Sequence, residues 1–319
     1  MPLTNVNQTT QWLLIGSPII LMIFCLFFFS TSVTLFIVNR AAAFQSFQHY
    51  QSVHYGQARA QQMDIFRPDA KSEKLLPVVV FFYGGCWGAC SHLKKEDYAF
   101  VAESFSSNRI VAVVPDYRVY PDVNFNEIMN DASSLVEWVH SHIQDYGGDP
   151  KQIFLMGHSS GAHLAAMLAV NRQYLAPQTY GDIKGFIGLA GPYNFLPFDE
   201  DYMPILFGSL ASPADSQPIH FIDGTQPPLL LMHGATDTRV KPSNAETMAK
   251  KALDVGGNIE KHIYEDIDHA AIVGEFSILL RNKSQIFSDT LDFIKKYSIA
   301  DSEAAKETAD ETADKAVNN

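Results

Sequence analysis

The strongest constraint on the fold is an alternation of short apolar runs with longer amphipathic stretches through residues 61–298. The apolar runs are rich in β-branched and aromatic residues and lie at 77–83, 110–115, 153–156, 186–190 and 228–232. Such runs are typical of parallel strands that are covered on both faces. The stretches between them, such as 126–142, 160–171, 245–255 and 285–297, have the apolar spacing of helices. We therefore expect an α/β fold with a mostly parallel central sheet flanked by helices.

A Gly-x-Ser-x-Gly motif stands where the apolar run 153–156 meets a helix-like segment. A strand, a sharp turn and a helix in this order form the setting of a nucleophile elbow. Gly157 and Gly161 would let neighbouring backbone pass close to the turn. The start of the following helix favours negative charge beside Ser159. Ser159 is therefore the candidate nucleophile.

A serine hydroxyl needs a base to take its proton, and the base needs a carboxylate to fix its tautomer. Among eleven histidines, His269 lies on a late loop after a strand-like run. Asp237 follows the run 228–232, so the chain order is Ser159, Asp237, His269, an order in which such triads occur. Asp266 and Asp268 are rival acids, but they are too close in sequence to reach Nδ1 of a His269 that faces Ser159.

The segment Tyr83-Gly84-Gly85-Cys86-Trp87-Gly88 directly follows the first apolar run. A glycine pair, Gly84 and Gly85, lets backbone amides turn toward the elbow. N–H donors in such a place stabilise the negative oxygen of a tetrahedral intermediate. We expect the oxyanion hole to be formed by the N–H groups of Gly85, Cys86 and Ser160.

Two of the three cysteines allow two interpretations, a disulfide loop or a metal site. Cys25 lies in an apolar stretch, whereas Cys86 and Cys90 are close enough in sequence for a small disulfide loop or, together with His92, for metal binding. A zinc site would require a fourth ligand at recognisable spacing. Free or disulfide-bonded thiols are therefore favoured, and no metal is expected.

The N-terminal part of the chain has the pattern of a membrane anchor. No charged side chain precedes Arg40, and residues 13–38 are nearly all apolar. At ~1.5 Å per residue they would form a helix of about 39 Å, longer than the ~30 Å of a bilayer core. We expect a tail at 1–12, one transmembrane helix at 13–38 and a polar linker at 39–60. A removed signal peptide is less favoured, because no basic segment precedes the apolar run. Basic residues after the span favour a cytoplasmic catalytic domain, although the side of the membrane stays open.

Two other segments differ from the alternating pattern. Residues 192–226 contain five prolines with aromatic residues between them, which suits either a cap over the site or a surface excursion. Residues 299–319 are acidic, with a repeated Glu-Thr-Ala-Asp and no apolar face to bury, so we expect a disordered tail. The net charge of −12 argues against a nucleic-acid partner.

Taken together, these motifs resemble the esterase/lipase branch of the bacterial α/β-hydrolases, the HGGG group with feruloyl-esterase-like and kynurenine-formamidase-like members. The resemblance covers roughly residues 60–297 and departs from the family at Tyr83 and Cys86, which replace a histidine and a glycine. The segment 116–121 looks like the family's Asp-Tyr-Arg element, which braces the oxyanion loop. The resemblance implies that Asp116 and Arg118 form a supporting ion pair.

The resemblance also implies a reaction. It predicts cleavage of a small-molecule carboxylic ester through an acyl-enzyme, without a metal or an organic cofactor. An amidase or arylformamidase that uses the same triad is the alternative enzyme, and a non-catalytic binding module is the alternative of a different class. The oligomeric state and the natural substrate are not determined by these motifs.

Overall fold

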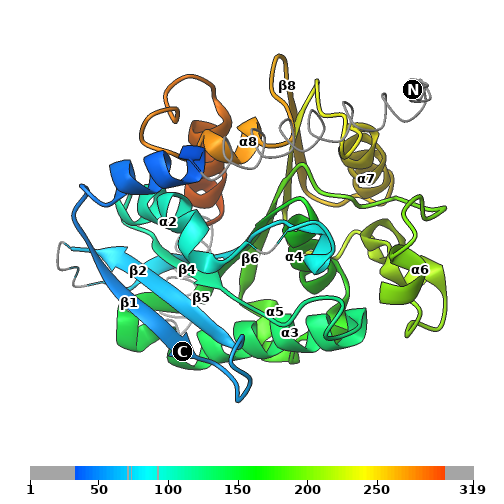
Figure 1. Ribbon diagram of the computed structural model, residues 1–319, viewed down its shortest axis with the longest axis horizontal. Helices are drawn as coiled ribbons and strands as arrows, with labels where there is room; N and C mark the ends of the chain where they lie inside the picture. The colour runs from blue at the N-terminus through cyan, green and yellow to red at the C-terminus, as the bar shows by residue number, and fades with distance from the viewer. Residues whose placement is uncertain (1–32, 70–71, 73, 92, 299–319) are drawn as a thin grey trace, which may run out of the picture.

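The computed structural model describes residues 33–69, 72, 74–91 and 93–298, and its core is an eight-stranded sheet (Figure 1). The strand order is β1-β2-β4-β3-β5-β6-β7-β8. Strand β2 pairs antiparallel with β1 and β4, and all other neighbours are parallel. The predicted mostly parallel α/β-hydrolase sheet is thus confirmed. The strands are β1 Phe47–His54, β2 Gln62–Pro68, β3 Leu76–Phe82, β4 Val111–Pro115, β5 Gly148–His158, β6 Ile183–Leu189, β7 Leu229–Gly234 and β8 Ile259–Tyr264.

Helices lie on both sides of this sheet (Figure 1). On one side α2 packs against the helical residues 286–298, with the rings of Phe105 and Phe287 6.4 Å apart. On the other side α3 contacts α4, and α4 lies against β3, β5 and β6. The helices are α2 Ala99–Ser106, α3 Phe125–His142, α4 Ser160–Val170, α5 Pro177–Gly181, α6 Met203–Leu206, α7 Ser243–Asp254 and α8 Ala271–Gly274.

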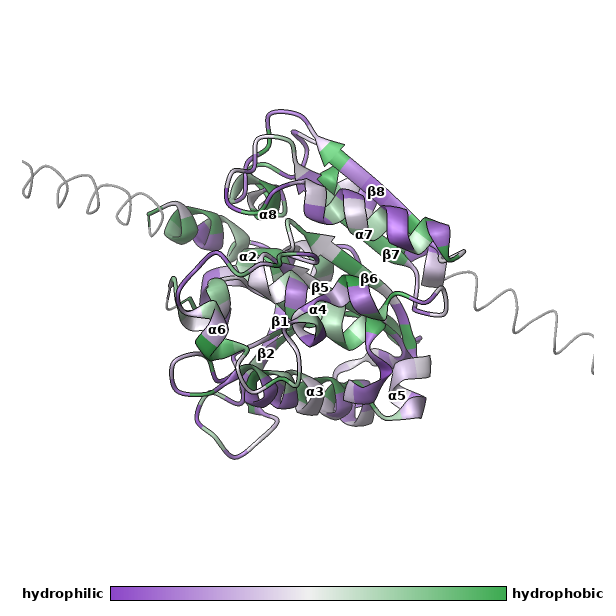
Figure 2. Ribbon diagram, turned by 90° about the vertical axis from the view of Figure 1, so that its right-hand side faces the viewer, coloured by the Kyte–Doolittle hydropathy of each residue, from purple (hydrophilic) through white to green (hydrophobic). Residues whose placement is uncertain are grey.

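Figure 2 shows the hydropathy of the elements, and the most apolar strands are also the most deeply buried. Strands β4 and β7 are buried along their whole length, whereas the edge strand β8 is half-buried and largely hydrophilic. Helix α3 begins at a capping box, in which Asn124 accepts the N–H of Glu127 and Glu127 accepts the N–H of Asn124. It buries its apolar face and exposes its polar face, as its sequence pattern predicts.

The prediction of a polar linker at 39–60 is wrong. Residues 33–42 are helical, and residues 47–54 form the edge strand β1. Strand β1 escaped detection because it pairs with β2 through its backbone and needs little apolar surface at the edge of the sheet. His49 also binds Asp64 across this pair at 2.8 Å.

Two expectations concern residues that the structure does not describe. The tail at 299–319 lies wholly outside the described residues, and so does most of the expected span at 13–38, apart from its last turns. Within the described ranges, no helix combines the length and the apolar character that crossing a bilayer requires.

The topology brings three chain segments to one edge of the sheet. Strands β5, β6, β7 and β8 are consecutive and parallel in the sheet, so the carboxyl ends of β5, β7 and β8 lie at the same edge. Ser159 follows β5, Asp237 follows β7 and His269 follows β8. In open α/β sheets this edge is where ligand sites form.

Candidate active site

Ser159 occupies a sharp turn between β5 and α4. Its backbone has φ 56° and ψ −127°, a region that costs a non-glycine residue about 1–3 kcal/mol. The turn is possible because its flanking positions carry no Cβ. A Cβ on Gly157 would lie 2.4 Å from the carbonyl carbon of Gly161, and one on Gly161 would lie 2.1 Å from the carbonyl oxygen of Phe82. The local sequence thus forms the elbow that the motif predicts.

The structure brings together the three side chains of the predicted triad. The Ser159 hydroxyl donates to Nε2 of His269 at 2.9 Å, and Nδ1–H of His269 donates to Oδ2 of Asp237 at 2.7 Å. The Ser159 and His269 positions are 110 residues apart in the chain. A hydroxyl, an imidazole and a carboxylate in this order can transfer a proton from the hydroxyl as it attacks a carbonyl.

Asp237 is held as a carboxylate by several donors. Its side chain is fully buried, and it accepts the N–H groups of Arg239 and Val240, both at 2.9 Å. Nε2 of His233 lies 3.2 Å from Oδ2. Burial alone would raise the pKa of Asp237, but the hydrogen bonds from His233 and His269 outweigh it and keep the pKa well below its ordinary value. The group therefore stays charged and fixes the tautomer of His269.

The rival acids have other roles. Oδ1 of Asp268 accepts the N–H groups of Ala270 and Ala271 at 3.0 and 2.8 Å, and so caps the short helix that follows His269. Asp266 sits in a turn with a left-handed φ of 56°. Asp237 is the acid that contacts the imidazole.

His158 is a supporting residue that the sequence reasoning missed. It precedes the nucleophile, and its Nε2–H donates to the main-chain oxygen of His269 at 2.7 Å. Burial and the nearby His269 lower the pKa of His158 to about 3, so the ring is neutral. The elbow thereby holds the loop of the base through a direct hydrogen bond. No local signal reveals such a contact, because its partner is 111 residues away.

The predicted oxyanion loop lies against the nucleophile. A Cβ on Gly84 would lie 2.9 Å from Cβ of Ser159, so only a glycine lets the loop approach this closely. The chain then turns through left-handed backbone at Gly85, Cys86 and Trp87, with φ of 134°, 55° and 55°. The predicted donors Gly85 and Cys86 therefore lie on a loop beside Ser159. The third donor, Ser160, begins α4, where helical N–H groups have no partner within the helix.

The predicted ion pair between Asp116 and Arg118 is wrong. Arg118 instead binds Asp131 of α3 through two hydrogen bonds of 2.9 and 2.6 Å. Oδ1 of Asp116 accepts the hydroxyl of Tyr83 at 2.7 Å and the N–H of Lys95 at 2.9 Å. Residues two apart in a chain do not necessarily face each other, and α3 supplies a better-placed carboxylate. Asp116 still braces the oxyanion loop, through the tyrosine that replaces the family's histidine.

Residues 192–226 pack against the oxyanion loop, as a cap segment would. The indole N–H of Trp87 donates to Nδ1 of His163 at 3.1 Å, and Nε2–H of His163 donates to the main-chain oxygen of Ser216 at 2.7 Å. The rings of Trp87 and Phe207 are 5.2 Å apart. Burial lowers the pKa of His163 to about 4, so this ring is neutral and bridges both segments. The segment is therefore part of the site's surroundings.

The two cysteines of the oxyanion loop form a disulfide between Cys86 and Cys90. The described residues hold no group of three or more histidines, cysteines or acidic residues that could bind a metal ion. His92, the third member of the metal alternative, lies outside the described residues.

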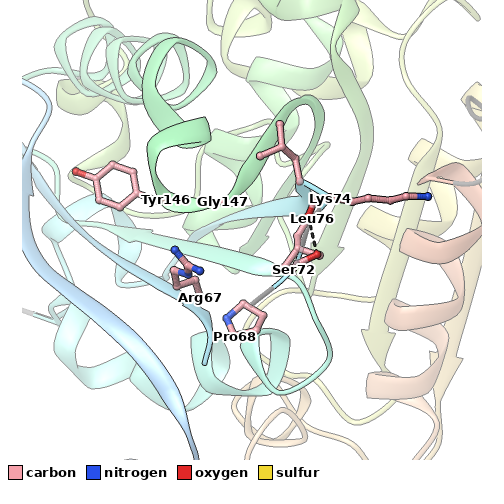
Figure 3. Close-up of a pocket in the computed structure, with 8 residues that line it drawn as sticks. Arg67, Pro68, Ser72, Lys74, Leu76, Tyr146 and Gly147 are labelled. Atoms are coloured by element: carbon pink, nitrogen blue, oxygen red, sulfur yellow. Dashed lines mark hydrogen bonds between the residues drawn. The ribbon is translucent and has the colours of Figure 1, made fainter. Parts of the chain in front are cut away.

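Two cavities differ in their relation to the triad. A cavity of about 630 Å³ borders the oxyanion loop and is lined in part by Tyr83, Gly84, Trp87 and Gly88. A smaller one of about 60 Å³ lies where β2 ends and β3 and β5 begin, at the opposite end of the parallel strands (Figure 3). Only the first adjoins the nucleophile, through Gly84.

Comparison with known proteins agrees with this architecture. The native structure of esterase 2 from Thermogutta terrifontis superposes with a TM-score of 0.62 at 24% identity, covering 80% of this chain and 92% of that one. Esterase B from Lactobacillus rhamnosis superposes with a TM-score of 0.72 at 16% identity, covering 87% and 97%. These likenesses establish the fold.

Sequence relatives include isoprenylcysteine α-carbonyl methylesterase ICME of Arabidopsis thaliana, 27% identical over 79% of this chain and 63% of its own length. Esterase LipC of Mycobacterium tuberculosis is 26% identical over 64% of this chain, which spans 55% of LipC. The BD-FAE family model matches residues 63–252. Because this match covers more than half of the chain and includes the oxyanion loop, the elbow and Asp237, the chain belongs to the BD-FAE family of α/β-hydrolases.

Proposed function

We propose that this protein is a serine hydrolase that cleaves carboxylic esters through an acyl-enzyme. The observation that carries the proposal is the continuous hydrogen-bonded chain from Ser159 to His269 to Asp237. The names of the relatives support the same class, since ICME is a methylesterase and LipC an esterase.

The geometry suggests the order of events. His269 takes the hydroxyl proton at Nε2 while Oγ of Ser159 attacks the ester carbonyl. N–H groups of Gly85, Cys86 and Ser160 stabilise the oxyanion. The imidazolium, stabilised by Asp237, gives its proton to the leaving alcohol. A water molecule, deprotonated by His269, then releases the acid and restores the hydroxyl.

An amide substrate is the second candidate. Kynurenine formamidase of Danio rerio is 28% identical over 49% of this chain, and a formamide can be attacked by the same triad. Hydrolysis rates for matched p-nitrophenyl esters and formanilides separate the candidates. We expect the esters to be favoured, and exclusive turnover of the formanilides would replace the proposal by an amidase.

Labelling with a fluorophosphonate probe tests the nucleophile. We expect wild type to be labelled and Ser159→Ala to be unlabelled, with ester hydrolysis lowered by several orders of magnitude. Ser141→Ala is a matched control, because Ser141 is exposed on α3 and its hydroxyl donates to the main-chain oxygen of Glu137 in the same helix. Persistent labelling of Ser159→Ala would refute the assignment.

We also propose that residues 13–38 anchor the chain in a membrane, on the basis of their uncharged, apolar sequence. The disulfide of the oxyanion loop favours an oxidising compartment for the catalytic domain. In this proposal the disulfide counts for more than the basic residues after the span, which weakly favour a cytoplasmic catalytic domain. The full chain should resist extraction from membranes by alkaline carbonate, and a chain without residues 2–32, which keeps Leu35 and Val38 in their packing against the core, should be released. Full extraction of both would refute the anchor.

A further inference from the structure

The disulfide between Cys86 and Cys90 closes the loop that carries two of the expected oxyanion donors. The two Cα atoms are 5.3 Å apart. The N–H groups of Gly88 and Cys90, inside the ring that the disulfide closes, both donate to the carbonyl oxygen of Gly85, the residue before the ring, at 3.0 and 3.3 Å. Cys86 is half-buried and Cys90 is exposed, so a reductant in solution can reach the bond.

The backbone inside this ring is held in an unfavourable conformation. Cys86 and Trp87 both have φ of 55°, and the left-handed region costs a residue with a Cβ about 1–2 kcal/mol. Trp87 is anchored by its hydrogen bond to His163. Cys86 is joined by its side chain to Cys90. Without the cross-link, Cys86 gains freedom to return to a negative φ, and its N–H would then point elsewhere.

Arg239 links this loop to the loop of the catalytic acid. One guanidinium nitrogen, Nη2, lies 3.3 Å from Sγ of Cys86 and 3.0 Å from Sγ of Cys90. The main-chain N–H of the same residue donates to Oδ1 of Asp237 at 2.9 Å. One residue thus contacts both the disulfide and the carboxylate. A cation beside the sulfurs also favours thiolates once the bond is broken.

We propose that the Cys86–Cys90 disulfide, supported by Arg239, positions the oxyanion donors, so that ester hydrolysis depends on the oxidised loop. The inference rests on the proposed function. In the reduction, a dithiol supplies two electrons and two protons, the S–S bond breaks to give two thiols, and the dithiol becomes a disulfide. Cys86, Cys90 and Arg239 are thereby positioning residues that act through the backbone of the loop.

The expected effect falls on turnover rather than on binding. Loss of one oxyanion donor lowers kcat by about 10²–10³ in serine hydrolases, and a displaced donor costs less than a deleted one. We therefore expect reduction to lower kcat for p-nitrophenyl acetate at least about tenfold, with KM changed less than about twofold. Reoxidation with oxidised glutathione should restore kcat.

The experiment uses the full chain with Cys25→Ser, so that only Cys86 and Cys90 report on thiol content. Alkylation and mass spectrometry give the fraction reduced, and thermal unfolding of the same samples shows that they are folded. Cys90→Ser should have the kcat of the reduced enzyme and no further response to dithiothreitol. Arg239→Met should lower kcat in the oxidised enzyme, and Arg239→Lys, which keeps the charge, should restore part of it.

The outcomes separate this inference from the proposed function. Fully alkylated, folded enzyme with kcat within twofold of the oxidised form would overturn the inference, and so would a loss confined to KM. In both cases labelling of Ser159 in the oxidised enzyme would leave the proposed function standing. An oxidised enzyme that neither is labelled at Ser159 nor hydrolyses any ester would overturn the proposed function, and the inference with it.

Discussion

Replacing Asp237 by asparagine tests the electrostatic part of the mechanism. The substitution keeps the shape of the side chain but removes a fully buried negative charge 2.7 Å from Nδ1 of His269. During attack on the ester, His269 becomes an imidazolium. Two unit charges about 4 Å apart at an effective dielectric constant of about 20 interact with about 4 kcal/mol. At ~1.4 kcal/mol per factor of ten, kcat should fall about a thousandfold.

The assay is kcat and KM for p-nitrophenyl acetate, measured with Asp268→Asn as the matched control. Asp268 is one residue from His269, but it caps a helix and does not contact the imidazole. We expect its substitution to change kcat less than about threefold, since asparagine can still accept the N–H groups of Ala270 and Ala271 and only an exposed charge is lost. A folded Asp237→Asn enzyme with kcat within tenfold of wild type would refute the reasoning, as would a larger loss in Asp268→Asn.

Three other predictions follow from packing and burial. Gly161→Ala should lower the free energy of unfolding by about 3 kcal/mol in denaturant titrations, because its Cβ would overlap backbone atoms. Gly181→Ala is the control: a Cβ there has no atom within 4 Å and should change the free energy of unfolding by less than about 0.5 kcal/mol. Equal effects of the two substitutions would contradict the elbow geometry. His158→Leu should lower kcat about tenfold at constant KM, because it removes one buried hydrogen bond to the loop of the base; unchanged kcat would exclude this role. The pKa of His163 is about 4 in the folded chain and about 6.5 in the unfolded chain. Between these two pH values the unfolded chain binds more protons, so the free energy of unfolding falls as the pH falls. His163→Gln should reduce the slope of unfolding free energy between pH 6.5 and 5 by up to ~1.4 kcal/mol per pH unit, and an unchanged slope would show that His163 is not buried neutral.

Much of the fold was readable in the sequence because its signals are local. The runs that became β3, β4, β6 and β7 are apolar along their length, and each of these strands has a neighbouring strand on both sides in the sheet. The amphipathic stretch 126–142 became α3 within one residue of its predicted start. The edge strand β1 was missed, because a half-exposed, polar strand has neither of these signals.

The same distinction applies to the site. The elbow was predictable, since glycine is required at two positions around Ser159 by the turn itself. Asp237 and His269 were found by their places after strands. Arg118, in contrast, was assigned to Asp116, although its partner Asp131 is 13 residues away on α3. The contact of Arg239 with a disulfide about 150 residues away leaves no trace in any local pattern.

By itself, the sequence determined which segments become buried strands and helices and which three side chains form the triad, because hydropathy period and turn chemistry act over a few residues. Only the tertiary structure decided how the loops are held: His158 on the main chain of His269, Tyr83 on Asp116, and the disulfide beside Arg239. These contacts join segments that the sheet brings together at one edge. Their existence depends on distances in space that spacing along the chain does not encode.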